Sequence, residues 1–147
     1  FDEMVDFDEI AVRGLRAVVE VATREHPVSH TLTGSFGRMR AEDATAMAMI
    51  ISELVQNAAE HGLADRGGTI DLAAHRATGA DGAEELTVSV TDDGVGLPPG
   101  FRPVLAGLGT RIVTSLVQDL QGRIRWENSS PHGTRVVFVA RLRPLER

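Results

Sequence analysis

Apolar residues recur along the chain at two spacings, and the longer spacing predicts three helices. Apolar positions at helical intervals predict an amphipathic helix over about residues 7–24, ended by Pro27. A second helix is expected over about residues 41–61, where Gly62 stops it. The third helix contains the apolar positions between residues 112 and 120. All three patterns are typical of helices that bury one face.

Five shorter segments carry the alternating or β-branched pattern of strands. They are residues 28–36, TIDLAAH, ELTVSVTD, RIRWEN and TRVVFVARL. A Gly/Asp-rich loop between the second and third strands indicates an antiparallel pair, and the turn SSPHG joins the last two. The order α-β-α-β-β-α-β-β predicts an α+β two-layer sandwich, with three helices packed on one face of a five-stranded mixed sheet.

Composition narrows the classes of protein that this fold can serve. We expect residues 1–147 to form a single domain, since this length allows a sizeable core. The chain has no cysteine and no apolar run long enough to span a membrane, which fits a cytoplasmic protein. A net charge of −6 argues against a nucleic-acid surface. There is no lysine, which excludes a P-loop and a eukaryotic-type protein kinase.

A polar edge interrupts the second predicted helix, in the stretch SELVQNAAEHG. On a helical wheel Glu53, Asn57, Glu60 and His61 form one stripe beside the apolar face, where half-covered polar groups need partners. An acid and an amide one turn apart can place oxygens around Mg²⁺. The same pattern fits a solvated helix edge with an i, i+4 polar pair, and for this segment alone we favour that simpler interpretation.

Two glycine motifs come after the polar edge. In VTDDGVGLPPG, a carboxylate at a strand end can accept a hydrogen bond from an exocyclic amine such as that of adenine, and the glycines allow close approach of a ligand. A tight acidic turn is the alternative. In AGLGTRIV, Gly107 and Gly109 precede a helix whose free N–H groups form an anion site. An ordinary helix start explains this second motif equally well.

In this order, the segments resemble a known family. ELVQNAAEHG resembles the N box, DDGVGLP the G1 box and GLGTRIV the G2 box of the ATP-binding domain of two-component sensor histidine kinases. That superfamily (GHKL) also contains DNA gyrase B, a heat-shock chaperone and MutL. The tail GRIRWENSSPHGTRVVFVARL resembles its closing hairpin, so the resemblance spans roughly residues 41–142. The short lid and the lack of a clear F box are most similar to the HisKA_2/HWE-type subgroup, and within it to actinobacterial PdtaS-type kinases.

The resemblance implies ATP and Mg²⁺ as ligands and assigns roles to the matching residues. Glu53 would be the acid near the attacking or metal-bound water, Asn57 would ligate Mg²⁺, and Asp92 would accept a hydrogen bond from adenine N6. The other implied contacts are His61 near the phosphates, Thr134 near the base, Gly94, Gly96 and Leu97 shaping the pocket, and Gly107, Leu108, Gly109 and Thr110 cradling the phosphates.

The implied function is that of a histidine protein kinase domain in two-component signal transduction. It would donate the γ-phosphoryl group of Mg-ATP to a histidine on a dimerisation and phosphoacceptor domain of the same protein, upstream of a response regulator. No histidine lies on a long charged helix and the chain begins without methionine, so we expect the phosphoacceptor and sensor domains to lie upstream. No nucleic-acid partner, and no membrane contact within this segment, is expected.

One departure from the family pattern and two alternatives stay open. Many members carry lysine at the position of Glu60, where a carboxylate would repel phosphate, so Arg102 or Arg111 would have to supply the missing cation. One alternative is an anti-sigma-factor-type serine kinase of the same superfamily. The other is a non-catalytic nucleotide-sensing module.

Overall fold

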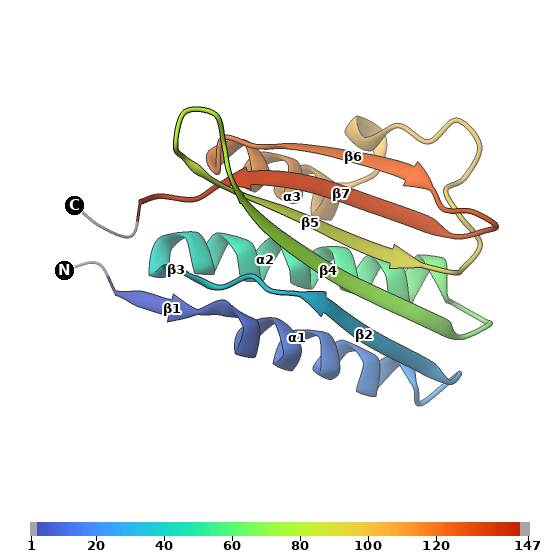
Figure 1. Cartoon of the computed structure of the whole chain (residues 1–147). Helices are drawn as coiled ribbons and strands as arrows, with labels where there is room; N and C mark the ends of the chain where they lie inside the picture. The colour runs from blue at the N-terminus through green and yellow to red at the C-terminus, as the bar shows by residue number, and fades with distance from the viewer. Residues whose placement is uncertain (1–2, 145–147) are drawn as a thin grey trace.

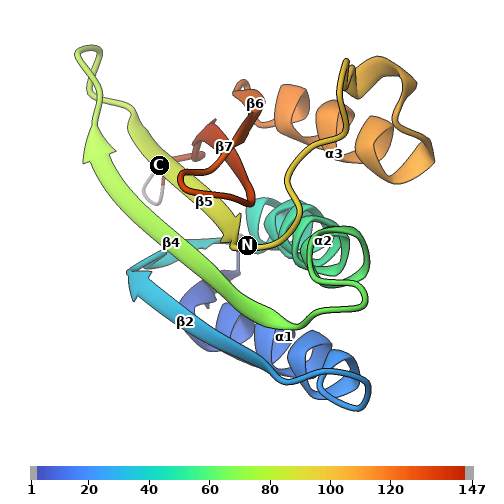
Figure 2. The ribbon, with the colours of Figure 1, turned by 90° about the vertical axis from the view of Figure 1, so that its right-hand side faces the viewer.

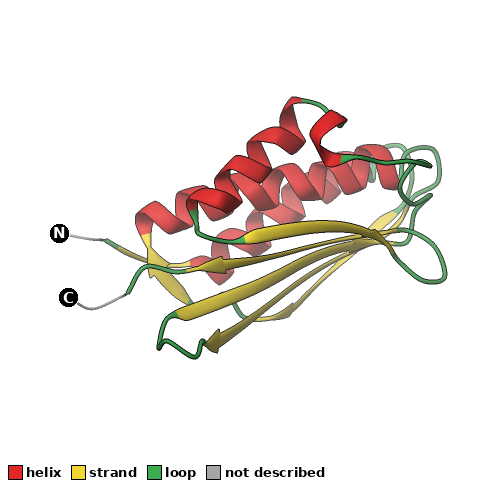
Figure 3. Ribbon diagram, turned by 90° about the horizontal axis from the view of Figure 1, so that it is seen from above, coloured by secondary structure: helices red, strands yellow, loops and turns green. Residues whose placement is uncertain are grey.

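The computed structural model describes residues 3–144, and its layers are those that the sequence predicts (Figure 1). Three helices cover one face of a five-stranded sheet, and the other face is open (Figure 3). The elements in chain order are β1 (Met4–Asp6), α1 (Phe7–Ala22), β2 (Val28–Gly34), β3 (Arg38–Arg40), α2 (Ala41–Asn57), η1 (Ala58–Gly62), β4 (Gly68–Thr78), β5 (Glu84–Asp92), η2 (Pro103–Leu105), α3 (Leu108–Asp119), β6 (Arg123–Asn128) and β7 (Thr134–Arg141).

The sheet has the strand order β2-β4-β5-β7-β6. β2 runs parallel to β4, and the other neighbouring pairs are antiparallel, as expected for β4 with β5. Alternation sends Leu72, Val88 and Phe138 into the core beneath the helices, while Thr87 and Ser89 lie on the open face. The mixed sheet is therefore confirmed.

Helix α2 lies between α1 and α3 over the middle of the sheet (Figure 2). Met47, Ile50 and Leu54 are buried on it, and each such side chain contributes about 1.5–3 kcal/mol of hydrophobic stabilisation. This burial fixes the direction of the helix and brings its C-terminal end to the end of β5. Within residues 3–144, no helix combines the length and the apolar character that crossing a membrane requires.

The second predicted helix does not stay α-helical to its end. After Asn57 the backbone forms a π turn over Ala58–Gly62, in which Leu63 N–H donates to the Ala58 carbonyl oxygen at 2.9 Å. This i→i−5 bond makes the turn wider than an α-helical turn. The prediction of helix to residue 61 therefore has the right extent and the wrong geometry in its last turn.

A two-stranded sheet of β1 and β3 is an element that the sequence pattern did not predict. Each strand has three residues, which is too short for an alternating pattern to be recognised. The sheet lies at the start of α2, where the Ala41 N–H donates to the Glu3 carbonyl oxygen at 2.8 Å. At the same place the buried Asp43 pairs with the guanidinium of Arg143 at 2.7 Å.

Candidate functional site

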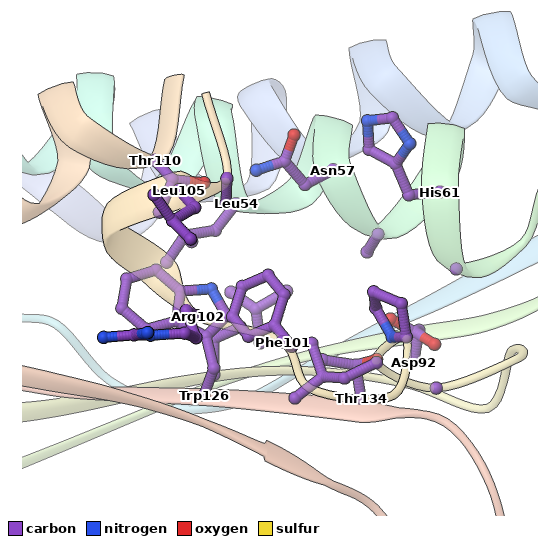
Figure 4. Close-up of a pocket in the computed structure, with 18 of the residues that line it drawn as sticks. Leu54, Asn57, His61, Asp92, Phe101, Arg102, Leu105, Thr110, Trp126 and Thr134 are labelled. Atoms are coloured by element: carbon purple, nitrogen blue, oxygen red, sulfur yellow. The ribbon is translucent and has the colours of Figure 1, made fainter. Parts of the chain in front are cut away.

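A cavity of about 480 Å³ opens between α2 and the sheet, at the end of the molecule where β5 ends (Figure 4). A segment of residues 96–107, which we call the lid, closes one side of it. Seven of the residues predicted for the site line the cavity: Asn57, His61, Asp92, Gly96, Leu97, Thr110 and Thr134. They come from α2, the end of β5, the lid, the start of α3 and β7, so the fold brings together segments up to 77 residues apart, from Asn57 to Thr134.

Asp92 lies at one end of the cavity, in register with Thr134 on the neighbouring strand. Its side chain is buried, with 4% of the residue exposed, and its Oδ1 accepts a hydrogen bond of 2.8 Å from the Gly94 N–H. Burial raises the pKa of this carboxyl above its ordinary value, and hydrogen bonds from the backbone of Gly94 and Thr134 partly oppose that rise. The carboxylate is thus held rigidly, with little water around it.

The loop after β5 is pressed against the end of η1. A Cβ added at Gly94 would lie 1.8 Å from the Gly62 carbonyl oxygen, so no other residue fits without moving the backbone. The same oxygen accepts the Val95 N–H at 3.0 Å. Gly94 does not line the cavity; its small size lets the loop hold Asp92 in place.

The other end of the cavity is formed by the start of α3. The N-cap residue Gly107 has a φ of 109° and makes no side-chain cap hydrogen bond. The positive end of the helix dipole is therefore available to an anion. Thr110 in the first turn is buried and lines the cavity, whereas Gly107, Leu108 and Gly109 lie outside the lining.

Glu53 lies between α2 and the start of α3, outside the cavity lining. A Cβ added at Gly109 would lie 2.3 Å from one Glu53 carboxylate oxygen, so a side chain there would displace this carboxylate. The carboxylate therefore packs against the first turn of α3, one helical turn before Asn57.

The prediction that one polar edge of α2 includes Glu60 is wrong. Asn57 and His61 face the cavity, but Glu60 is exposed and lines a groove between α1 and α2. The π turn explains the difference, because a wider turn advances each residue by less than the 100° of an α-helix. Glu60 is thereby rotated toward α1, while His61 stays on the side of Asn57. The Glu60 carboxylate therefore does not line the cavity that Asn57 and His61 face.

The sequence patterns did not identify several residues of the cavity wall. Phe101 of the lid lines it, and so does Trp126 of β6. The rings of Phe101 and Trp126 have centroids 6.3 Å apart and are tilted by 48°. Of the two arginines expected to supply a cation for phosphate, Arg102 lines the cavity and Arg111 is exposed on α3. A lid has no periodicity from which contacts can be inferred, although the chain's one tryptophan on an edge strand was an available signal.

The side chains that could act as ligands limit which metal ion fits the cavity. Between residues 3 and 144 no three His, Cys, Asp or Glu side chains are grouped so that they could hold a metal ion. A site built wholly from such ligands is therefore not formed by this part of the chain. Mg²⁺ commonly takes one or two protein oxygens and fills its other positions with phosphate and water. The amide oxygen of Asn57 on the cavity wall fits that requirement.

Comparisons with known proteins agree with this geometry. The family described as "Histidine kinase-, DNA gyrase B-, and HSP90-like ATPase" matches residues 42–144. The chain is 38% identical to "Sensor histidine kinase PdtaS" of Mycobacterium tuberculosis over 141 residues, which are 93% of this chain and 27% of that protein. It is 38% identical over 81 residues to "Blue-light-activated histidine kinase 2" of Erythrobacter litoralis, covering 54% of this chain and 22% of that protein.

The solved structures give the same result. The histidine kinase domain of the Erythrobacter litoralis EL346 blue-light activated histidine kinase has a TM-score of 0.80 and 26% identity, over 94% of this chain and 62% of that one. The chain spans about a quarter of the length of the PdtaS proteins that it matches. The similarity to PdtaS confirms the type expected from the motifs. The chain belongs to the family of histidine kinase-, DNA gyrase B- and HSP90-like ATPases.

Proposed function

We propose that this chain binds Mg-ATP in the cavity and donates the γ-phosphoryl group to a histidine on a separate phosphoacceptor domain of the same protein. The observation that carries the proposal is the different chemistry of the two ends of one cavity. One end holds a buried carboxylate, Asp92, and the other holds the uncapped start of α3. Such a cavity is suited to a ligand with an amine at one end and phosphates at the other.

The base would occupy the end beside Asp92. The backbone of Gly94 and Thr134 already bonds this carboxylate, and an oxygen lone pair that faces the cavity would accept the adenine N6 amine. Thr134 lies beside Asp92 on β7 and would contact the same base. Val90 and Val136 supply apolar wall around them. A few polar groups that orient a ligand within an apolar pocket are typical of small-molecule sites.

The phosphates would lie toward the start of α3, cradled by Gly107, Leu108, Gly109 and Thr110. His61 and Arg102 line the cavity and would contact phosphate oxygens. Asn57 would hold Mg²⁺, which would neutralise phosphate charge as the phosphoryl group is transferred. Glu53 would be the acid near the attacking group, next to the first turn of α3.

In the transfer, a bond forms between an imidazole nitrogen of the phosphoacceptor and the γ-phosphorus. The bond from that phosphorus to the bridging oxygen breaks, ADP leaves, and the imidazole gives up its N–H proton to water. The cavity residues act by positioning and by electrostatic stabilisation, as in phosphoryl transfer generally. The names of the relatives support this choice of acceptor, since each is called a histidine kinase. We further propose that the phosphoryl group then passes to a response regulator.

The test is a transfer assay with γ-labelled ATP, Mg²⁺ and the phosphoacceptor domain produced separately. We expect a label on that domain that is lost in acid and kept in base. Asn57→Ala should abolish the label, whereas Gln56→Ala, at an exposed neighbouring position, should retain it. An acid-stable label would favour the serine kinase, and an intact fold without ATP binding would favour the non-catalytic module.

A further inference from the structure

Residues 97–106 of the lid make one hydrogen bond and one ring contact with the rest of residues 3–144, and both are with β6. At its start, the Leu97 N–H donates to the Asn128 Oδ1 at 2.9 Å. In its middle, the ring of Phe101 packs against Trp126. Trp126 and Asn128 are two residues apart on a strand, so they lie on the same face of it. That face looks toward the helices and the cavity (Figure 4).

Between residues 97 and 106, the described chain shows no further hydrogen bond or ring contact from the lid to another element. The hydrogen bonds of Phe101, Leu105 and Ala106 are short-range turns within the lid itself. Val104 and Leu105 are 71% and 75% exposed, and their short turn lies against α3, which follows it in the chain. The position of the first half of the lid therefore depends on β6.

The cavity in turn depends on the lid. Eight of its twenty lining residues lie between Leu97 and Ala106. If the lid leaves β6, these residues move away together, and only an open groove between α2 and the sheet remains. A ligand in a closed cavity is shielded from water and makes stronger polar contacts than one in an open groove.

We propose that Trp126 and Asn128 of β6 are positioning residues that hold the lid over the nucleotide and thereby set how long Mg-ATP stays bound. This rests on the proposed function, because it concerns the occupant of the same cavity. Neither residue need touch the reacting phosphorus. The edge strand works as a dock: the ring pair and the Asn128 hydrogen bond form when the lid is closed and break when it opens.

The dock predicts an effect on dissociation more than on association. The nucleotide enters when the lid is open, but it leaves only after both contacts break. Loss of the ring pair or of the hydrogen bond should therefore raise the dissociation rate by about two- to tenfold each. Association should change less, as is usual for mutants of one binding site.

The chain supplies its own reporter, because Trp126 is its one tryptophan and it has no tyrosine. In nucleotide-free protein, Phe101→Leu should make the Trp126 fluorescence more accessible to acrylamide. Val104→Ala, at an exposed lid position outside the cavity lining, is the matched control and should leave quenching unchanged. This comparison needs no nucleotide, so it tests the dock even if the proposed function fails.

The second measurement is stopped-flow release of a fluorescent ATP analogue in the presence of Mg²⁺. Phe101→Leu and Asn128→Ala should release it faster. Trp126→Phe, which keeps an aromatic pair, and Asn128→Asp, which keeps the acceptor oxygen, should keep release as slow as in the wild type. The dock is overturned if Phe101→Leu changes neither quenching nor release more than Val104→Ala does. If the wild-type chain binds no nucleotide, the proposed function fails, and the quenching comparison alone decides the dock.

Discussion

Replacing Asp92 by asparagine tests the proposed base-binding end of the cavity with the smallest change of shape. The asparagine carbonyl oxygen can keep the 2.8 Å hydrogen bond from the Gly94 N–H, which leaves the new NH₂ group pointing where the second carboxylate oxygen stood. In the free protein that group lies on the cavity wall, where water can bond it, and bound adenine would exclude this water. A bound adenine would then present its amine to another donor.

The expected magnitude comes from this mismatch. Leaving a buried hydrogen-bonding group without a partner costs about 1–3 kcal/mol, which corresponds to about a 5- to 150-fold loss of ATP affinity. The same substitution should affect folding in the opposite direction. Since burial raises the pKa of Asp92, the ionised carboxylate destabilises the fold at neutral pH, and asparagine removes that charge. The variant should therefore be more stable than the wild type at pH 7.

Calorimetric titration with ATP and with inosine triphosphate, which has an oxygen in place of the amine, separates these effects. The wild type should prefer ATP, and Asp92→Asn should lose or reverse the preference because its NH₂ can donate to that oxygen. Asp93→Asn removes the same charge at an exposed neighbour and is the control. Unchanged ATP affinity, or an unchanged preference, would refute the adenine assignment. In thermal melts, the stability difference should shrink as the pH falls toward the ordinary aspartate pKa of 3.8.

Three further substitutions test the geometry described above. Gly94→Ala should lower the free energy of unfolding by about 1–3 kcal/mol, because its Cβ would lie 1.8 Å from the Gly62 oxygen. Gly14→Ala is the control: it has open space in a helix and should raise the free energy of unfolding by about 0.5–1 kcal/mol. Both are measured by denaturant unfolding. Glu60→Gln should leave ATP affinity unchanged in calorimetry, and a marked gain would show that this carboxylate reaches the phosphates. Asp43→Ala should lower stability by about 1–3 kcal/mol, since it removes the acceptor of two hydrogen bonds from its arginine partner; an unchanged urea midpoint would contradict this.

The elements that could be predicted are those whose burial repeats with a period. The alternation of β5 and the apolar spacing of α2 gave the correct element types, and the glycine loops gave the antiparallel pairing. The β1–β3 sheet was missed because three residues carry no period. The apolar pattern also does not show that the last turn of α2 widens where Gly62 packs against Asp92.

For the candidate site too, residues on regular elements were easier to predict than residues on the irregular lid. Residues on regular elements, such as Asn57 and Asp92, lie in the cavity wall, and their roles there stay predictions. The sequence could neither place Phe101 nor choose Arg102 over Arg111, because an irregular segment takes its position from whatever it packs against. Glu60 was misplaced because the wheel assumed an α-helix through a π turn.

That π turn also limits how many residues this part of the chain can contain. Adding one more residue between Asn57 and Gly62 would rotate the downstream residues by about 100° around the helix axis. A residue with a side chain would then face the Asp92 carboxylate, where a Cβ at Gly62 already comes within 2.6 Å of an oxygen. In the turn between β4 and β5, a Cβ added at Gly82 would meet nothing within 4 Å, so this turn has room for a further residue. Insertions should therefore accumulate in that turn and be excluded from the end of α2.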